Sequence, residues 1–487
     1  MSQTNATTDR RHARPHPRWA WIVIVLAATG IAVRQTSRSE RTPRRGTRRL
    51  ERAIAEMQGK YLLGVGEWPF VDRTELLEQA QAFDAGPPLR RFRFVVIVGE
   101  LAGPDAALER LIDYEKQPSA AQWSADERRI EKTLRRLYRD QAAGRLAAPS
   151  LGRHDRRLLQ RKLGWNGRLA LHPADGPEPD VRQALLASAQ RTALALLAGL
   201  AVLALAGMVG LAALLVFAAL LMSGKLQRPL AAPAQQGGIY AETFAIWLVL
   251  FVVLASLPDL WVATGLVRPM RHSGLLVQGG AMLLSLAALL WPVWRGVPWS
   301  RVREEIGWTS GRRPLIEVLL GGATYVAAIP LLFVGLIGAA ILLSIERLLP
   351  GSSAPEALDP TTLPSHPIIE WVTRGGAWGR LQVVLIASVV APLVEETMFR
   401  GVLYRHLRDA TGGRLGFGLS VFVSGSAVSF VFAAIHPQGW VAIPALMSLA
   451  FAFALAREWR GTLVPAVIAH GLNNGLVTWL LFRLVHL

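Results

Sequence analysis

Three short segments near the end of the chain carry ionisable and amide side chains within apolar sequence. They read 395-EETMFR-400, 432-FAAIH-436 and 470-HGLNN-474. Carboxylates and imidazoles are the usual general acids and bases of enzymes. Amide and imidazole donors can stabilise the oxyanion that forms when water attacks a carbonyl group. Brought together, the three segments would supply the groups that hydrolysis requires.

Helical geometry predicts how the side chains of each segment are arranged. Glu396 and Arg400 are four residues apart, so they share a helix face and can form an ion pair. Glu395 is rotated by about 100° from Glu396, so we expect it to face elsewhere. His470 and Asn474 are also four apart and share a face. A cluster of Glu395, two histidines and Asn474 then requires only that three helices meet.

Each segment alone also has a structural interpretation. The Glu–Arg pair could be an interfacial ion pair, His436 precedes a proline and could end a helix, and His470 could simply hydrogen-bond across helices. However, a charged side chain at the centre of a membrane helix costs roughly 2.5–3.5 kcal/mol. An intramembrane ionisable residue is therefore a candidate functional residue by default, and three such segments together favour a site.

The elements that must position these residues are predicted to cross a membrane. The chain is 52% hydrophobic and 18% charged, whereas soluble proteins are about 25% charged. Most of its apolar runs approach the ~20 residues that span a bilayer. We therefore predict an all-α, multi-pass bundle of about 8–9 transmembrane helices in the cell membrane. The runs lie at 19–33, 193–222, 240–262, 274–294, 315–345, 381–399, 416–436, 439–456 and 462–482.

Composition divides the chain into four predicted parts. They are a basic N-terminus with a short anchor (1–52, anchor 19–33), a soluble helical domain (53–190), accessory transmembrane helices (191–300) and the part with the three segments (301–487). In the soluble part, Ser124 and Glu127 match a helix capping box, and Gly-Pro at 103–104 marks another helix start. No catalytic constellation occurs there, so a packing or docking module is favoured. The chain has no cysteine, which excludes disulfides and thiolate chemistry.

The distribution of charge predicts partners and topology. The net charge is +18, but arginines beside a membrane segment are more typical of topology signals or contacts with anionic lipid than of nucleic-acid binding. We therefore expect the lipid bilayer, and no nucleic acid, as a partner. The more basic loops after residue 222, near 223–228, 295–313, 400–414 and 457–460, are predicted to be cytoplasmic, which places 53–190 outside. The eight arginines of 34–52 favour the opposite side for that flank.

With this apolar context, the three segments resemble the CPBP family of intramembrane proteases, also called the CAAX-protease and bacteriocin-processing, or Abi, family. Its motifs EExxxR, FxxxH and HxxxN all occur here in the same order. The resemblance extends over about residues 300–482, whereas 1–190 resemble no family we can name. It implies an all-helical membrane fold with an active site inside the bilayer. The implied activity is endopeptidase cleavage of a membrane-associated protein or peptide.

The resemblance also implies a role for each motif residue. Glu395 and His436 would activate a water molecule. His470 and Asn474 would stabilise the oxyanion or help to hold a metal. Glu396 and Arg400 would shape the site. The full set of candidate catalytic residues is Glu395, Glu396, Arg400, His436, His470 and Asn474.

A metal is a second way to activate the water. The family is commonly labelled as metalloproteases, and Glu395, His436 and His470 could hold a divalent ion such as zinc with water as the fourth ligand. The HExxH arrangement of many zinc proteases is absent.

Two other functions remain open at this stage. The chain could be a non-catalytic membrane scaffold of the same fold, although all motif residues are intact. It could also be a proton-coupled transporter, although the EExxxR segment is not duplicated as paired transporter halves would suggest. The sequence does not identify the substrate, a need for prenylation or the oligomeric state.

Overall fold

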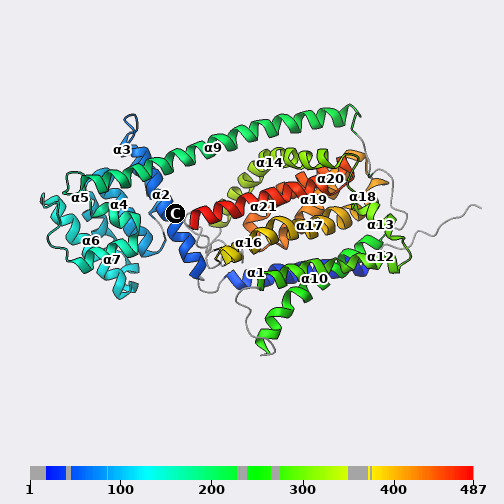
Figure 1. The fold of residues 1–487 in the computed structure, drawn as a ribbon, viewed down its shortest axis with the longest axis horizontal. Helices are drawn as coiled ribbons and strands as arrows, with labels where there is room; N and C mark the ends of the chain where they lie inside the picture. The colour runs from blue at the N-terminus through cyan, green and yellow to red at the C-terminus, as the bar shows by residue number, and fades with distance from the viewer. Residues whose placement is uncertain are drawn as a thin grey trace, which may run out of the picture. The chain divides into compact units, whose positions relative to one another are not determined.

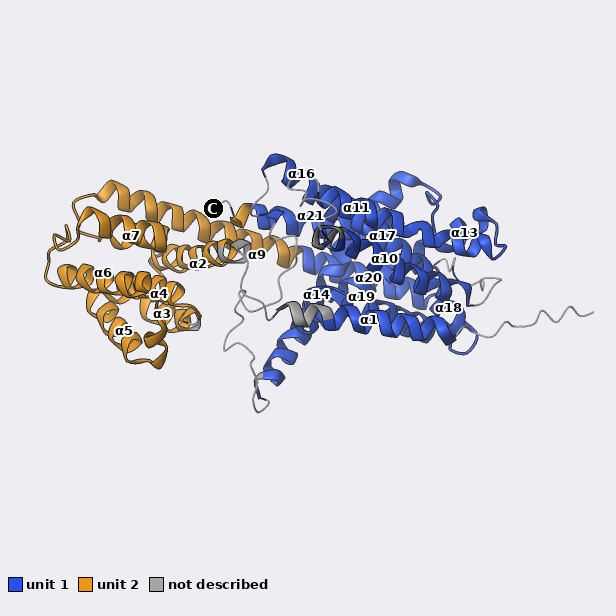
Figure 2. Ribbon diagram, turned by 90° about the horizontal axis from the view of Figure 1, so that it is seen from below, with its two compact units in different colours: residues 1–42, 206–348, 364–482 blue, residues 43–205, 349–363, 483–487 orange. Residues whose placement is uncertain are grey.

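The structure is a computed structural model that describes residues 18–39, 45–84, 86–226, 230, 238–264, 274–348, 371–372 and 376–485. Within these ranges the chain forms helices and turns and no strand, so the predicted all-α class is confirmed (Figure 1). Residues 1–17 of the predicted basic N-terminus lie outside the described residues. The chain forms two compact units, which are coloured separately in Figure 2.

Among the described residues, eight helical segments are long and apolar enough to cross a membrane. The prediction of a multi-pass membrane protein is thus confirmed. A further apolar helix, α1 (Arg18–Ser39), is apolar over a shorter stretch that ends at Val33. The eight segments are α9 (Pro179–Met222), α10 (Ile239–Ala263), α11 (Gly274–Ser285) continued by α12 (Leu290–Trp294), α14 (Pro314–Leu348), α16 to α18 (377–412), α19 (Phe417–Ala434), α20 (Ile443–Arg460) and α21 (Val464–Val485).

Glycines allow the membrane helices of the first unit to approach closely. Helix α20 packs against both α14 and α19. A Cβ atom at Gly335 of α14 would lie only 2.5 Å from the carbonyl oxygen of Pro444, at the start of α20. A Cβ at Gly471 of α21 would lie 2.6 Å from the carbonyl oxygen of Ser388. Small residues at such crossings let backbones touch, and this contact replaces the hydrophobic drive that is missing in lipid.

The segment 377–412 is one continuous but irregular helix. Regular α-helix in α16 (Ala377–Leu385), α17 (Ala391–Glu396) and α18 (Tyr404–Gly412) is interrupted by π-helical turns at Ile386–Val390 and Thr397–Leu403. Such turns are rare and are frequent at functional sites.

The predicted loop at 400–414 is in fact helical as far as Gly412. Its charged residues stay within the bundle because they are paired. Arg408 donates to Glu458 of α20 at 2.9 Å, and the Tyr404 hydroxyl donates to the same carboxylate at 2.9 Å. The charges that suggested a loop are therefore buried contacts between α18 and α20.

The second unit includes residues 43–205, and with them the stretch 53–190 for which a soluble helical domain is predicted. Two apolar clusters form its core. The predicted capping box is confirmed, with Ser124 and Glu127 exchanging hydrogen bonds at the start of α6. Helix α5 begins at Pro104, directly after Gly103 with a φ of 93°, as the Gly-Pro signal predicts. Its helices are α2 (Arg45–Gly66), α3 (Arg73–Ala80), α4 (Pro88–Ala102), α5 (Pro104–Lys116), α6 (Ala125–Ala142), α7 (Arg153–Leu163) and α8 (Trp165–Ala170).

A buried carboxylate closes the loop after α6. Asp140 accepts a hydrogen bond from the backbone N–H of Ser150 at 3.0 Å and another from Arg145 at 2.8 Å. Hydrogen bonding from Ser150, followed by that from the Arg145 guanidinium, holds the pKa of Asp140 below its usual range. The loop therefore depends on an ionised carboxylate.

We predict that Asp140→Asn lowers the local free energy of unfolding of the α6–α7 connection by about 1–3 kcal/mol at neutral pH, because the negative charge and one of the two acceptor oxygens are lost. A group whose pKa is lowered in the folded state stabilises it above the unfolded pKa, and this stabilisation disappears as pH falls through the folded pKa. The difference between wild type and variant should therefore shrink in acid. Hydrogen exchange of residues 140–151 in the full chain measures it.

Asp113→Asn is the matched control, since Asp113 is an exposed carboxylate 3.6 Å from Lys116. Exposed pairs contribute little, so this change should leave protection unaltered. Equal loss of protection in both variants would contradict the role of Asp140.

Candidate active site

Three helical elements bring a carboxylate and two imidazoles together. Glu395 lies in α17, between the two π-helical turns, and its Oε2 atom is 3.7 Å from Nε2 of His436 and 3.7 Å from Nε2 of His470. His436 lies two residues beyond the end of α19, and His470 lies in α21. These three predicted site residues therefore meet, although they are up to 75 residues apart in sequence.

The partners of the two imidazoles determine which nitrogen carries hydrogen. Nδ1 of His436 is 2.6 Å from the carbonyl oxygen of Phe432, and Nδ1 of His470 is 2.8 Å from Oε1 of Glu396. A carbonyl or carboxylate oxygen only accepts, so both Nδ1 atoms must donate. In a neutral imidazole the Nε2 atom is then unprotonated. We thus assign to both histidines a tautomer that presents an Nε2 lone pair toward Glu395.

The second carboxylate belongs to a fully buried ion pair. Arg400 donates from Nη1 to Oε1 of Glu396 at 2.9 Å, and both side chains are 0% exposed. This confirms the predicted pairing within the helix. Arg400 also donates to the carbonyl oxygen of Ala450 at 3.1 Å, and its guanidinium lies 4.6 Å above the ring centre of Phe432.

His470 bridges the two carboxylates, which sequence reasoning did not foresee. We expected Glu395 to face away from Glu396, but each carboxylate contacts a different nitrogen of the same imidazole. The two side chains do leave the helix in different directions, and the flat ring extends between them. The result is a continuous polar chain from Arg400 through Glu396 and His470 to Glu395.

The hydrogen bonds of Asn474 link α21 to a neighbouring helix. Its Nδ2 atom donates to the carbonyl oxygen of Ala387 at 2.9 Å, and its Oδ1 atom accepts from Asn473 at 3.1 Å. Its observed contacts are therefore with the first π-helical turn and not with Glu395. Ser388 in the same turn was missed by sequence reasoning, and its buried hydroxyl has no hydrogen-bond partner among the described residues. Gly471 inside the HxxxN motif and Gly475 directly after it were the available signal, because a Cβ atom at either position would contact Ser388.

Aromatic rings form the apolar wall of the site. The ring centres of Phe432 and His436 are 4.1 Å apart. Phe453 of α20 stacks on His470, with 5.6 Å between the two ring centres. Phe453 was not among the predicted residues and lies outside all three motifs. Close-packed rings keep bulk water away from the buried ion pair and fix the orientation of both imidazoles.

The fit of a metal ion can be tested on the donor set. Within the described part of the chain, no group of three histidine, aspartate or glutamate side chains is arranged to hold a metal ion. Even so, Oε2 of Glu395 is 3.7 Å from Nε2 of each histidine, only slightly more than the ~3.4 Å between two ligands of a tetrahedral zinc ion with bonds of about 2.1 Å. The zinc assignment stays a prediction.

Comparison with known proteins points to one family. The family model described as "Type II CAAX prenyl endopeptidase Rce1-like" matches residues 377–476, a segment that includes all six predicted site residues. The membrane-embedded CAAX protease MroQ of Staphylococcus aureus (strain USA300) is 29% identical over 103 residues, which are 21% of this chain and 40% of that protein. No solved structure matches the chain. The resemblance to the CPBP family of CAAX proteases is therefore confirmed for residues 377–476, which form helices α16 to α20 and most of α21.

Proposed function

We propose that the chain is an intramembrane endopeptidase that cleaves a peptide bond of a membrane-associated protein or peptide. The observation that carries this proposal is the meeting of Glu395 Oε2 with two Nε2 atoms whose rings are anchored through Nδ1. Three proton acceptors that face one space in an apolar bundle are suited to bind and deprotonate a water molecule.

In the proposed reaction, Glu395 removes a proton as the water oxygen attacks the carbonyl carbon of the substrate. The peptide C–N bond then breaks, and the departing amine receives the proton from the Glu395 carboxyl group. His436 orients the water through its Nε2 lone pair. The carboxylate is regenerated at the end, so the cycle needs no other reactant.

Glu396 and Arg400 serve the reaction indirectly in this proposal. Glu396 accepts the Nδ1 hydrogen of His470 whether or not Nε2 is also protonated, so it holds the ring in one orientation. His470 could donate to the oxyanion only in the doubly protonated state. Asn474 anchors α21 to the π-helical turn through Ala387, which differs from the oxyanion role that the resemblance implies.

We predict that Glu395→Gln lowers hydrolysis at least about 10²-fold, as loss of a general base usually does, while the protein keeps its thermal stability. The purified chain in lipid nanodiscs would be incubated with a membrane-protein fraction, and new N-termini would be counted by mass spectrometry. Glu304→Gln is the matched control at an exposed position. Hydrolysis by a Glu395→Ala protein at the wild-type rate would show that Glu395 is not the base. If the wild-type chain forms no new N-termini, the protease assignment is wrong and a scaffold or a transporter is left.

We further predict that Arg400→Met destabilises the protein by about 3–5 kcal/mol, because it leaves Glu396 as a buried charge without its cation. The double variant Glu396→Gln/Arg400→Met should regain much of this loss. Glu396→Gln alone should reduce hydrolysis less than Glu395→Gln. Thermal unfolding in detergent, analysed as a double-mutant cycle, gives the coupling energy.

Arg301→Met is the control for this cycle, since Arg301 forms an i,i+4 pair with Glu305 but is 44% exposed. Its cost should stay below about 1 kcal/mol. Additive effects of the two buried substitutions, or equal loss of hydrolysis from both glutamate variants with the fold intact, would show that the carboxylates are not divided in this way.

We expect hydrolysis to persist after metal removal, because the proposed cycle uses the Glu395 carboxylate as the base and no metal ion. The chain would be treated with EDTA and 1,10-phenanthroline, its metal content measured by mass spectrometry and its rate compared with untreated protein. Loss of activity that Zn²⁺ restores would instead support the metal site of Glu395, His436 and His470.

A further inference from the structure

Charge is segregated within the helical domain of residues 53–190. Helices α6 and α7 together carry 11 basic and 5 acidic side chains. The rest of the domain carries 10 basic and 14 acidic side chains. A domain that is close to neutral overall therefore has one strongly basic side, and the proposed protease chemistry does not use it.

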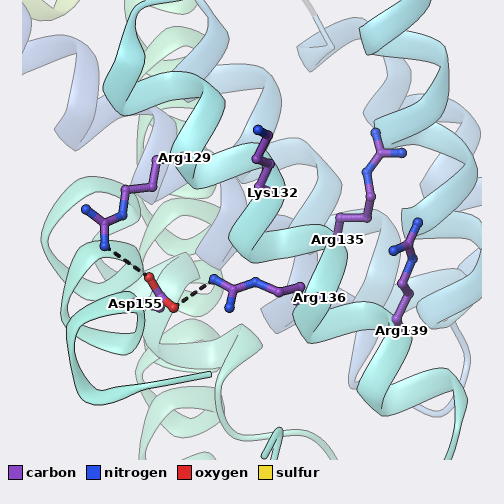
Figure 3. A pocket seen from close by; sticks show the side chains of 6 residues that line it. All are labelled: Arg129, Lys132, Arg135, Arg136, Arg139 and Asp155. Carbon is purple, nitrogen blue, oxygen red and sulfur yellow. Dashed lines mark hydrogen bonds and ion pairs between the residues drawn. The ribbon is translucent and has the colours of Figure 1, made fainter. Parts of the chain in front are cut away.

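The basic side is a stripe along the exposed face of α6. Arg128, Lys132, Arg135 and Arg139 recur at helical spacing, while Leu134 and its apolar neighbours on the opposite face enter the core. From first to last the stripe extends over 11 residues, or about 16 Å along the helix axis. Figure 3 shows the side chains that line a hollow of about 460 Å³ here: Arg129, Lys132, Arg135, Arg136, Arg139 and Asp155.

Acidic neighbours neutralise only part of this stripe. Asp155 of α7 accepts from Arg136 at 2.7 Å and from Arg129 at 3.5 Å. Arg135 is paired with Glu115 and Glu131.

Three cations of the stripe remain without an acidic partner among the described residues. The ion pairs of those residues include neither Lys132 nor Arg139, and Arg128 donates only to the backbone carbonyls of Trp123 and Ala121. All three are exposed. The stripe thus presents uncompensated positive charge to whatever lies against it.

The membrane is an anionic partner that is always close to this domain. The first apolar helix, α1, precedes it by a short stretch of chain, and α9 continues from it without interruption as a membrane-spanning helix. The domain is therefore tied to the bilayer through α9, which gives lipid headgroups a high effective concentration. Clustered lysines and arginines near a membrane are a general signature of anionic-lipid binding.

We propose that the basic stripe, defined by Arg128, Lys132, Arg135 and Arg139, docks the domain onto the anionic phospholipid headgroups of the membrane that the chain spans. Guanidinium groups bind phosphate through paired hydrogen bonds, and the open hollow admits a headgroup. The contact between the stripe and the headgroups would hold the domain against the bilayer surface, in addition to its tether through the membrane helix α9.

The absence of cysteine allows a direct test with one label. The full chain with Ala125→Cys, at the exposed first residue of α6, would carry a fluorophore and be placed in nanodiscs that contain a headgroup-nitroxide lipid as quencher. We expect at least twofold more quenching in phosphatidylcholine with 30% phosphatidylglycerol than in phosphatidylcholine alone. About 1 M NaCl should abolish the difference, since the screening length falls to about 3 Å.

Charge-neutral variants identify the residues. Arg128→Gln/Lys132→Gln/Arg139→Gln should return quenching to the phosphatidylcholine level, with each lost charge weakening docking about fivefold. The matched control, Arg73→Gln/Lys116→Gln/Arg168→Gln, removes the same charge from exposed positions elsewhere in the domain and should leave docking intact. Quenching that is independent of lipid charge, or equal in both triple variants, would overturn the proposal. So would protection of the label by polyglutamate but not by anionic lipid, which would assign the stripe to an acidic polypeptide.

Discussion

The candidate site of this chain depends on pairing charged side chains inside an apolar bundle, where water cannot solvate them. A carboxylate or guanidinium inside an apolar bundle is costly unless a partner of opposite charge and enough hydrogen bonds surround it. Arg400, Glu396 and His470 supply partners for one another, and Ala450 adds a carbonyl oxygen, while Oε2 of Glu396 and Nε of Arg400 have no hydrogen-bond partner among the described residues. With the charge of Arg400 paired to Glu396, Glu395 is left available for chemistry. The packing of α17, α20 and α21 is therefore also the arrangement that makes a reactive carboxylate tolerable.

Sequence reasoning recovered whatever depends on local periodicity. Apolar runs of nearly bilayer length identified the spanning helices, because the length of a helix needed to cross lipid is fixed by geometry. The four-residue spacing of Glu396 and Arg400 predicted their ion pair, and Ser124 with Glu127 predicted a helix start. In each case the two partners lie within one turn, so backbone geometry alone sets their distance.

What the sequence did not reveal depends on contacts between helices. Nothing local indicates that both carboxylates meet the same imidazole, or that Asn474 reaches a backbone carbonyl of another helix. The charges of α18 resembled a loop because their partner, Glu458, lies about 50 residues later. Phe453 carries no motif at all, yet it stacks on His470. These features follow from which helices are neighbours, and periodicity does not determine neighbours.

The two π-helical turns have a consequence for how this region tolerates change in length. A π turn closes its hydrogen bonds over one more residue than an α turn, so 386–403 contain residues that a regular helix of the same rise would not accommodate. If the first turn kept all its residues but closed as a regular α-helix, everything beyond it would rotate by about 100° relative to the helix before it. Glu395 would then leave the side that faces the imidazoles. Over this stretch the number of residues constrains the protein as strongly as their identity, and an ungapped helical wheel would assign the faces wrongly.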